Sequence, residues 1–185
     1  SSACIEGMLA SAAPYVAVMD ADLQHDESVL PAMLELLRSG RADLVVGTRY
    51  AAGGSTGDWD QRRAGLSRLA TRASRLVVRQ PVSDPMSGYF MLRREVLDAS
   101  VRRLSGIGFK ILLDLLATAD TPHRVKEFPL QFAARREGES KLDRAILFDF
   151  LAGLYDKSLG RVIPTRFALF GTVGALGVVV HFMVL

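Results

Sequence analysis

The sequence predicts an α/β fold in which strands and helices alternate and pack in layers. Short apolar runs bounded by polar residues recur along the chain, and stretches with apolar side chains at helical spacing separate them. Hydrophobic residues make up 49% and charged residues 23% of the 185 positions, which excludes a disordered or collagen-like chain. The single cysteine, Cys4, excludes a disulfide framework and a CxxC metal site.

The first elements lie before a glycine-rich loop. Residues 1–13 lack the basic and apolar segments of a signal peptide and predict part of a helix. Residues 15–19 form an apolar run that enters an acidic cluster, which is typical of a strand buried on both faces. Apolar side chains at helical spacing predict a helix over residues 27–38. Residues 43–47 are the next predicted strand, and residues 51–58, with three glycines, predict a loop.

The remaining elements are predicted from the same patterns. Helices are expected over 60–78 and 109–118, a strand over 88–92, an extended segment over 124–132, a polar loop over 135–141 and an amphipathic helix over 143–159.

The final residues are strongly apolar. Residues 167–185 contain only one ionisable side chain, His181, and they match the length of a membrane-spanning helix. A helix buried in a protein core is the alternative. Because the chain lacks an initiator methionine and ends within this apolar run, we expect it to be truncated at both ends.

Two carboxylates at the end of the first strand are the sharpest chemical feature. Asp20 and Asp22 are two residues apart, so in an extended chain they point the same way and repel each other unless a cation lies between them. A hard divalent ion with oxygen ligands, shared with substrate phosphates, satisfies both groups, and Gln24 offers a further oxygen. The alternative is ordinary helix capping, in which Asp26 caps the helix that begins at Glu27.

The aspartate pair has two other interpretations. An EF-hand loop that begins at Asp20 needs glycine where this chain has His25, which excludes it. A phosphatase of the haloacid dehalogenase type also begins with a strand that ends in two such aspartates. That family has Thr or Val at the position of Gln24, so this alternative is disfavoured but stays open. The three histidines, His25, His123 and His181, are scattered and are interpreted as structural.

Basic residues predict an anionic partner. Arginines crowd residues 61–80, where no acidic residue occurs, and those at 68, 72, 75 and 79 share one helical face. A solvated face is the alternative. The stripe lacks interleaved aromatic side chains, so a lipid phosphate is favoured over nucleic acid. A second basic loop at 135–141 contains Arg136 and Lys141, which suit a diphosphate. Asp84 precedes a proline and is held extended before a turn at Ser87 and Gly88.

Five motifs occur in an order and spacing that resemble the dolichol/polyprenol-phosphate mannosyltransferases of glycosyltransferase family 2. They are Asp-Ala-Asp-Leu-Gln-His-Asp (20–26), Val-Gly-Thr-Arg-Tyr (46–50), Asp-Pro-Met-Ser-Gly-Tyr-Phe (84–90), Gly-Phe-Lys-Ile-Leu-Leu (108–113) and Gly-Glu-Ser-Lys-Leu (138–142). Residues 166–174 resemble the start of a GtrA-like membrane domain.

The resemblance implies a GT-A (Rossmann-like) domain over residues 1–142, incomplete at its N-terminus. It is followed by an amphipathic interface helix over 143–161 and by residues 162–185, which are the start of a transmembrane region. The implied reaction transfers mannose from GDP-mannose to a polyprenyl phosphate with inversion, on the cytoplasmic face of the cell membrane and without nucleic acid. The resemblance implies that Asp20, Asp22 and Gln24 bind Mg²⁺ or Mn²⁺. It implies that Arg49, Arg63 and Ser67 bind the acceptor phosphate and that Arg136 and Lys141 bind the donor phosphates. The residues implied in catalysis are Asp22, Arg49 and Asp84.

The sequence departs from the family at its beginning. The opening strand of the family and the residues that bind the nucleotide base have no counterpart here, so the donor nucleotide is left open. A UDP-glucose or UDP-N-acetylglucosamine transferase, the phosphatase named above and an inactive membrane-associated fragment therefore remain as alternatives.

Overall fold

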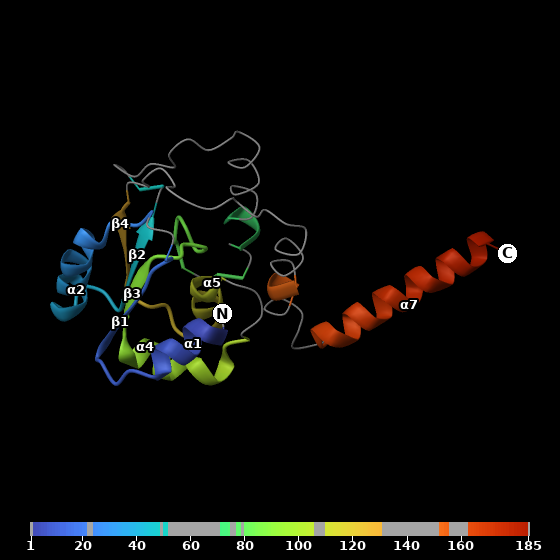
Figure 1. Ribbon diagram of the computed structural model, residues 1–185, viewed down its shortest axis with the longest axis horizontal. Helices are drawn as coiled ribbons and strands as arrows, with labels where there is room; N and C mark the ends of the chain where they lie inside the picture. The colour runs from blue at the N-terminus through green and yellow to red at the C-terminus, as the bar shows by residue number, and fades with distance from the viewer. Residues whose placement is uncertain are drawn as a thin grey trace.

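A computed structural model describes most of the chain. It covers residues 2–21, 24–48, 50–51, 71–74, 77–78, 80–105, 110–130, 152–155 and 163–184 of the 185 residues. The described residues form a mixed four-stranded sheet with helices on both faces, and a last helix that extends away from them (Figure 1). The predicted α/β class is confirmed.

The sheet has the strand order β1-β3-β2-β4. The four strands are β1 (Tyr15–Val18), β2 (Leu44–Thr48), β3 (Phe90–Arg93) and β4 (Val125–Pro129). β3 is antiparallel to both β1 and β2, whereas β4 is parallel to β2. The C-terminal ends of β1, β2 and β4 therefore lie at one edge of the sheet together with the N-terminal end of β3. This edge, where both Val18 and Val46 face Phe90 in the register, is called the motif edge below.

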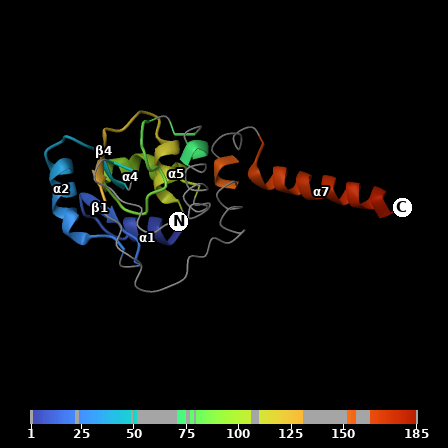
Figure 2. The ribbon, with the colours of Figure 1, turned by 90° about the horizontal axis from the view of Figure 1, so that it is seen from above.

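Helices cover both faces of the sheet. α2 (Leu30–Arg38) lies on one face, and α1 (Ser2–Leu9), α4 (Arg94–Ser100) and α5 (Ile111–Thr118) lie on the other (Figures 1 and 2). The helix predicted over 27–38 is confirmed, although its first turn is the 3₁₀ segment η1 (Glu27–Val29). The Asp26 side chain accepts a hydrogen bond from the Ser28 N–H at 2.9 Å, so the predicted cap at Asp26 is also confirmed.

Alternating side chains of the strands divide the core into two clusters. All five residues of β2 are buried, because successive side chains point to opposite faces and both faces are covered. The prediction that residues 15–19 form a strand buried on both faces is wrong, because β1 lies at the edge of the sheet, with Ala17 exposed and its other residues half-buried. On the face of α1, α4 and α5, the largest buried members are Leu44, Phe90, Leu92, Leu97, Leu112, Leu115 and Leu116. On the face of α2, they are Met33, Leu37, Val45, Tyr89 and Met91.

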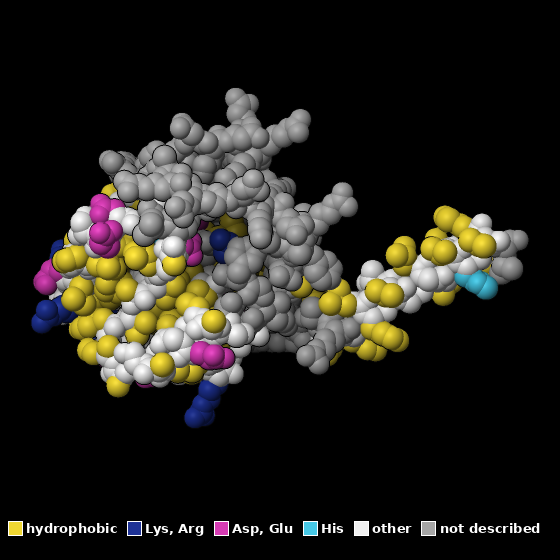
Figure 3. All heavy atoms as spheres, viewed as in Figure 1, with side chains coloured by type: hydrophobic (Ala, Val, Ile, Leu, Met, Phe, Trp, Pro, Cys, Tyr) yellow, Lys and Arg dark blue, Asp and Glu magenta, His cyan; other side chains and the backbone are white. Residues whose placement is uncertain are grey.

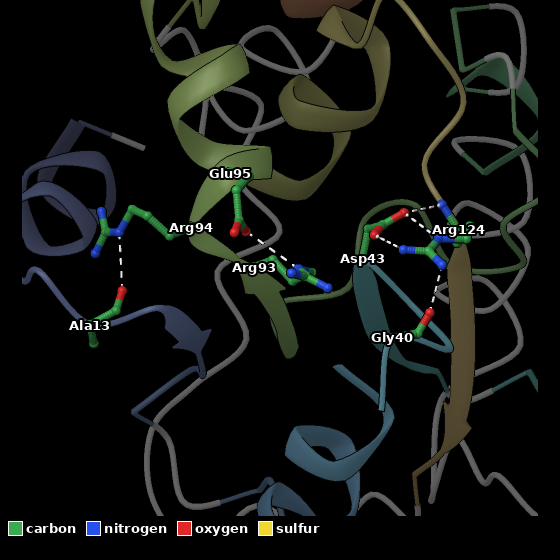
Figure 4. A network of polar contacts seen from close by, with 7 residues as sticks. All are labelled: Ala13, Gly40, Asp43, Arg93, Arg94, Glu95 and Arg124. Atoms are coloured by element: carbon green, nitrogen blue, oxygen red, sulfur yellow. Dashed lines mark hydrogen bonds and ion pairs between the residues drawn. The ribbon is translucent and has the colours of Figure 1, made fainter. Parts of the chain in front are cut away.

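Arginine side chains hold the edge opposite the motif edge (Figure 4). Arg124 donates from Nε and Nη2 to the two Asp43 carboxylate oxygens at 2.9 and 2.6 Å, and from Nη1 to the Gly40 carbonyl oxygen at 2.6 Å. These contacts join the start of β2 to the start of β4. The Arg94 guanidinium donates to three carbonyl oxygens at the end of α1 and before β1, those of Met8, Ser11 and Ala13.

Several predicted elements fall partly or wholly outside the described residues. Of the helix predicted over 60–78, residues 71–74 are helical, whereas residues 77–78 are described and are not, so the predicted end is too late. Of the segment 143–159, residues 152–155 are described and are helical. The loop predicted over 135–141 lies outside the described residues, as does the loop over 51–58 apart from residue 51. The short helix α4 was not predicted.

The last helix, α7 (Thr165–Val184), extends away from the rest of the described chain in both ribbon views (Figures 1 and 2). Apolar side chains along it are exposed, with Phe170 at 78% and Phe182 at 76% (Figure 3). In the described part of the chain, no helix is both long enough and apolar enough to cross a lipid bilayer.

Candidate functional site

The motif edge gathers three of the motifs that the sequence singles out. Residues 20–26 follow β1, residues 46–50 include the end of β2, and residues 84–90 lead into β3. Because β3 lies between β1 and β2, the segment before it contacts the segments that follow its two neighbours. Residues up to about 70 positions apart in sequence thus meet at one place, which is the usual position of a ligand site in an α/β sheet.

Asp20 lies against the backbone of Gly88. A Cβ atom placed on Gly88 would be 2.2 Å from Oδ2 and 2.7 Å from Oδ1 of Asp20, so only glycine permits this approach. On its other side, Asp20 Oδ2 lies 3.6 Å from Nε2 of His25. The Asp20 side chain is 61% exposed and the His25 side chain 3% exposed. The carboxylate is therefore held between two neighbours and remains open to solvent.

The buried aromatic ring of Tyr89 supports the positions of His25 and of the segment that follows Asp20. The rings of His25 and Tyr89 lie 4.9 Å apart, and Tyr89 is fully buried. The Tyr89 hydroxyl donates a hydrogen bond to the Asp26 carbonyl oxygen at 3.0 Å. Burial raises the pKa of the Tyr89 phenol, and the negative charges of Asp26 and Glu27 raise it further. The phenol therefore stays protonated at neutral pH and serves as a donor that fixes the segment after Asp20.

Ser87 joins the turn before β3 to the end of β2. Its hydroxyl donates to the Gly47 carbonyl oxygen at 2.6 Å and accepts from the Tyr89 N–H at 3.1 Å. The Gly47 N–H in turn donates to the Tyr89 carbonyl oxygen at 2.9 Å. A Cβ atom on Gly47 would lie 2.5 Å from Cδ1 of Leu130, so glycine also allows the chain that leaves β4 to approach β2 closely.

The turn predicted at Ser87 and Gly88 lies slightly earlier, over residues 84–87. The Ser87 N–H donates to the Asp84 carbonyl oxygen at 3.2 Å, and the Asp84 residue is 1% exposed. Next to it, the hydroxyl groups of Ser83 and Thr48 lie 2.8 Å apart, and the Tyr50 N–H donates to Thr48 Oγ1 at 3.1 Å. The turn is thus bound to the end of β2 at two points, Ser83 and Ser87.

The described residues include three of the predicted site residues. Asp20, half-buried Gln24 and buried Asp84 all lie on segments that meet at the motif edge. The other predicted site residues lie outside the described residues, namely Asp22, Arg49, Arg63, Ser67, Arg136 and Lys141.

The donor atoms at this edge are of the type that a hard divalent cation prefers. The Asp20 carboxylate and the Gln24 amide offer oxygen ligands, which suit Mg²⁺ or Mn²⁺ better than zinc. Within the residues that the structure describes, no three His, Cys, Asp or Glu side chains form a group that could hold a metal ion. The described oxygen donors thus fit such an ion in their chemistry alone.

Comparison with protein families decides the relationship. The family model described as "Glycosyl transferase family 2" matches residues 1–100, which contain the three motifs that meet at the motif edge. The chain belongs to glycosyl transferase family 2.

Individual relatives carry a more specific name. Proteins named dolichol-phosphate mannosyltransferase are 35% identical over 183 residues in Pyrococcus furiosus, 34% over 189 residues in Mycosarcoma maydis and 38% over 160 residues in Saccharomyces cerevisiae. These alignments cover 98%, 100% and 83% of this chain, but 51%, 60% and 58% of the relatives. The chain thus spans between half and three fifths of their length.

Among solved structures, the chain is similar to glucosyl-3-phosphoglycerate synthase from Mycobacterium tuberculosis in complex with phosphoglyceric acid. The sequence identity is 21% and the TM-score 0.46, over 83% of this chain and 52% of that one.

Two neighbours of Asp20 were not recognised from the sequence of this family 2 chain. Gly88 was interpreted only as part of a turn, and His25 only as a structural residue. The position of His25 five residues after Asp20, within one polar segment, is a local signal of their contact. The contact of Gly88 with Asp20 depends on the pairing of β1 with β3, which no local pattern reveals.

Proposed function

We propose that this chain is the part of a metal-dependent GT-A glycosyltransferase that transfers mannose from GDP-mannose to a polyprenyl phosphate, with inversion at the anomeric carbon. The observation that carries the proposal is the meeting of three motifs at the motif edge, where Asp20 contacts Gly88 and Ser87 binds Gly47. The names of the relatives, at 34–38% identity over most of the chain, support the choice of donor and acceptor.

In this proposal Asp20, Asp22 and Gln24 hold Mg²⁺ or Mn²⁺ against the donor diphosphate. A divalent ion at that position neutralises the charge that develops on the leaving diphosphate. The exposed carboxylate of Asp20 supports the assignment, because a ligand of a shared ion has to face the substrate. Arg136 and Lys141 close over the donor phosphates. Arg136 donates bidentate hydrogen bonds to them, and Lys141 supplies a localised positive charge.

The acceptor phosphate is bound by Arg49, Arg63 and Ser67. Its second pKa lies near ~6, so at neutral pH the attacking oxygen is already largely ionised and needs no strong base. The residues act mainly by holding this oxygen in line with the anomeric carbon. Asp84 is assigned to orient the acceptor or to remove its remaining proton, and its position in the turn that is bound to β2 supports a fixed orientation.

A lipid acceptor also fits the C-terminal part of the chain. We assign residues 1–142 to the catalytic domain, 143–161 to an interface helix and 162–185 to the start of a GtrA-like membrane region. The exposed apolar side chains of α7 support contact with a bilayer (Figure 3). We also propose that the active site lies on the cytoplasmic face of the cell membrane, where a polyprenyl phosphate can reach it.

The experiment that tests the proposal uses labelled donors. The chain is mixed with Mn²⁺, vesicles that contain a polyprenyl phosphate, and either GDP-mannose, UDP-glucose or UDP-N-acetylglucosamine, and the labelled lipid is identified. We expect label in the lipid from GDP-mannose and its loss with EDTA. Label from a UDP-sugar alone would correct the donor. Release of phosphate from a generic ester without any nucleotide sugar would favour the phosphatase instead.

A further inference from the structure

We infer that Gly88 is a positioning residue for the metal ligand Asp20, because its missing side chain provides the space in which the carboxylate lies. The inference rests on the proposed function in taking Asp20 as a ligand of the cation. A Cβ atom on Gly88 would lie 2.2, 2.6 and 2.7 Å from Oδ2, Cγ and Oδ1 of Asp20. These distances are far below van der Waals contact, so the carboxylate and a side chain at position 88 exclude each other.

The requirement for glycine at this position is steric and does not arise from the backbone. Among the described glycines, only Gly40 has a positive φ angle, at 69°. The backbone of Gly88 is therefore open to an alanine, and the effect of a substitution there reports on the space beside it.

The neighbours of Gly88 determine which of the two groups has to move. The Ser87 hydroxyl donates to the Gly47 carbonyl oxygen at 2.6 Å, and the Tyr89 carbonyl oxygen accepts from the Gly47 N–H at 2.9 Å. Phe90 is paired with strands on both sides. Asp20, by contrast, has left β1 and its side chain is 61% exposed. An added methyl group at Gly88 thus displaces the Asp20 carboxylate and leaves the turn in place.

His25 closes the other side of this space. Its side chain is 3% exposed and packs against the Tyr89 ring, with Nε2 at 3.6 Å from Asp20 Oδ2. Asp20 Oδ2 can move toward Nε2 by less than about 1 Å before it reaches hydrogen-bond distance, which is not enough to relieve a contact of 2.2 Å. The larger displacement that a Cβ atom requires is therefore outward, away from the position that faces Gly88.

The test measures binding of Mn²⁺ to the 185-residue chain directly, by the electron paramagnetic resonance signal of the free ion. Loss of a group that orients a ligand typically weakens metal binding 10- to 100-fold. We expect Gly88→Ala to weaken Mn²⁺ binding at least about tenfold, with an unchanged circular dichroism spectrum. The matched control is Gly7→Ala, since a Cβ atom on Gly7 meets nothing within 4 Å, and this variant should bind Mn²⁺ as the wild type does.

A double-mutant cycle shows whether Gly88 acts through Asp20. In the Asp20→Ala background the carboxylate is gone, so Gly88→Ala should cause no further loss of Mn²⁺ binding. If Gly88→Ala alone fails to fold, the double variant should fold, because the space is then free. Equal Mn²⁺ affinity of Gly88→Ala and wild type, equal losses in both backgrounds, failure of both variants to fold, or a wild type that binds no Mn²⁺ would each overturn the inference.

The two proposals fail separately. Sugar transfer by the wild type with normal Mn²⁺ binding by Gly88→Ala would leave the proposed function intact and remove the role of Gly88. Mn²⁺ binding that depends on Gly88, without transfer from any of the three donors, would keep that role and remove the transferase.

Discussion

Replacing Ser87 with alanine removes the contact that joins the turn before β3 to the end of β2. The hydroxyl makes two well-placed hydrogen bonds, at 2.6 Å to the Gly47 carbonyl oxygen and at 3.1 Å from the Tyr89 N–H, in a residue that is 7% exposed. Each such bond contributes about 1 kcal/mol net, and more when a buried partner is left unsatisfied. We therefore expect Ser87→Ala to lower the free energy of unfolding by about 2 kcal/mol, which corresponds to a fall in Tm of about 4–8 °C.

The assay is urea and thermal unfolding followed by circular dichroism, with Ser39→Ala as the matched control. The Ser39 hydroxyl makes a bond of similar length, 2.7 Å to the Glu35 carbonyl oxygen, but in an exposed position at the end of α2. Water replaces that bond, so the control should change stability by less than about 0.5 kcal/mol. If Ser87→Ala is no less stable than Ser39→Ala, the turn is not held by Ser87 and the reasoning on the motif edge is wrong.

Three further predictions concern the edge opposite the motif edge. Hydrogen bonding to Arg124 lowers the pKa of Asp43. This pair therefore stabilises the protein fully above the ordinary aspartate pKa, and the stabilisation is lost as pH falls through the lowered pKa of Asp43. Asp43→Asn should cost about 1 kcal/mol at pH 7 in urea unfolding, and an unchanged midpoint would refute this. Burial lowers the pKa of His123. The contribution of this buried side chain to the free energy of unfolding is therefore complete above the ordinary histidine pKa and is lost as pH falls below it. His123→Gln should flatten the dependence of Tm on pH in this range, and an identical profile would contradict the burial argument. Arg94→Met should lower the free energy of unfolding by about 2 kcal/mol through the loss of three hydrogen bonds to carbonyl oxygens, and a loss below about 0.5 kcal/mol would show that they contribute little.

Local patterns were sufficient for most strands and helices. The buried strand β2 and the partly buried edge strand β1 are both uniformly apolar, and α2 shows a clear helical spacing with a cap at Asp26. The helix α4 was missed because it has only seven residues and no side-chain cap at Arg93. The strand predicted over 88–92 begins at Phe90, since residues 84–87 form a turn and residues 88–89 connect it to the strand. These errors arise where the structure depends on short-range geometry that composition does not encode.

The candidate site was predicted by residue type but not by arrangement. Asp20 and Gln24 follow from the chemistry of oxygen ligands at the end of a strand. The contact of Asp20 with Gly88 requires β3 to be antiparallel to β1 with Val18 opposite Phe90, and this pairing is a tertiary property. The bond from Ser87 to Gly47 depends in the same way on the pairing of β3 with β2. Sequence patterns therefore singled out the candidate ligands and left the residues that contact them unidentified.

The most direct test of the account is the rate of sugar transfer from GDP-mannose to polyprenyl phosphate as a function of Mn²⁺ concentration. Wild type is compared with Asp20→Asn, Asp22→Asn and the control Asp98→Asn, whose side chain is exposed on α4. The account predicts transfer that saturates with Mn²⁺ in the wild type and in Asp98→Asn, and that is abolished in Asp22→Asn and strongly reduced in Asp20→Asn while all the variants stay folded. Transfer that survives both substitutions, or that proceeds unchanged in EDTA, would contradict a cation held by these aspartates.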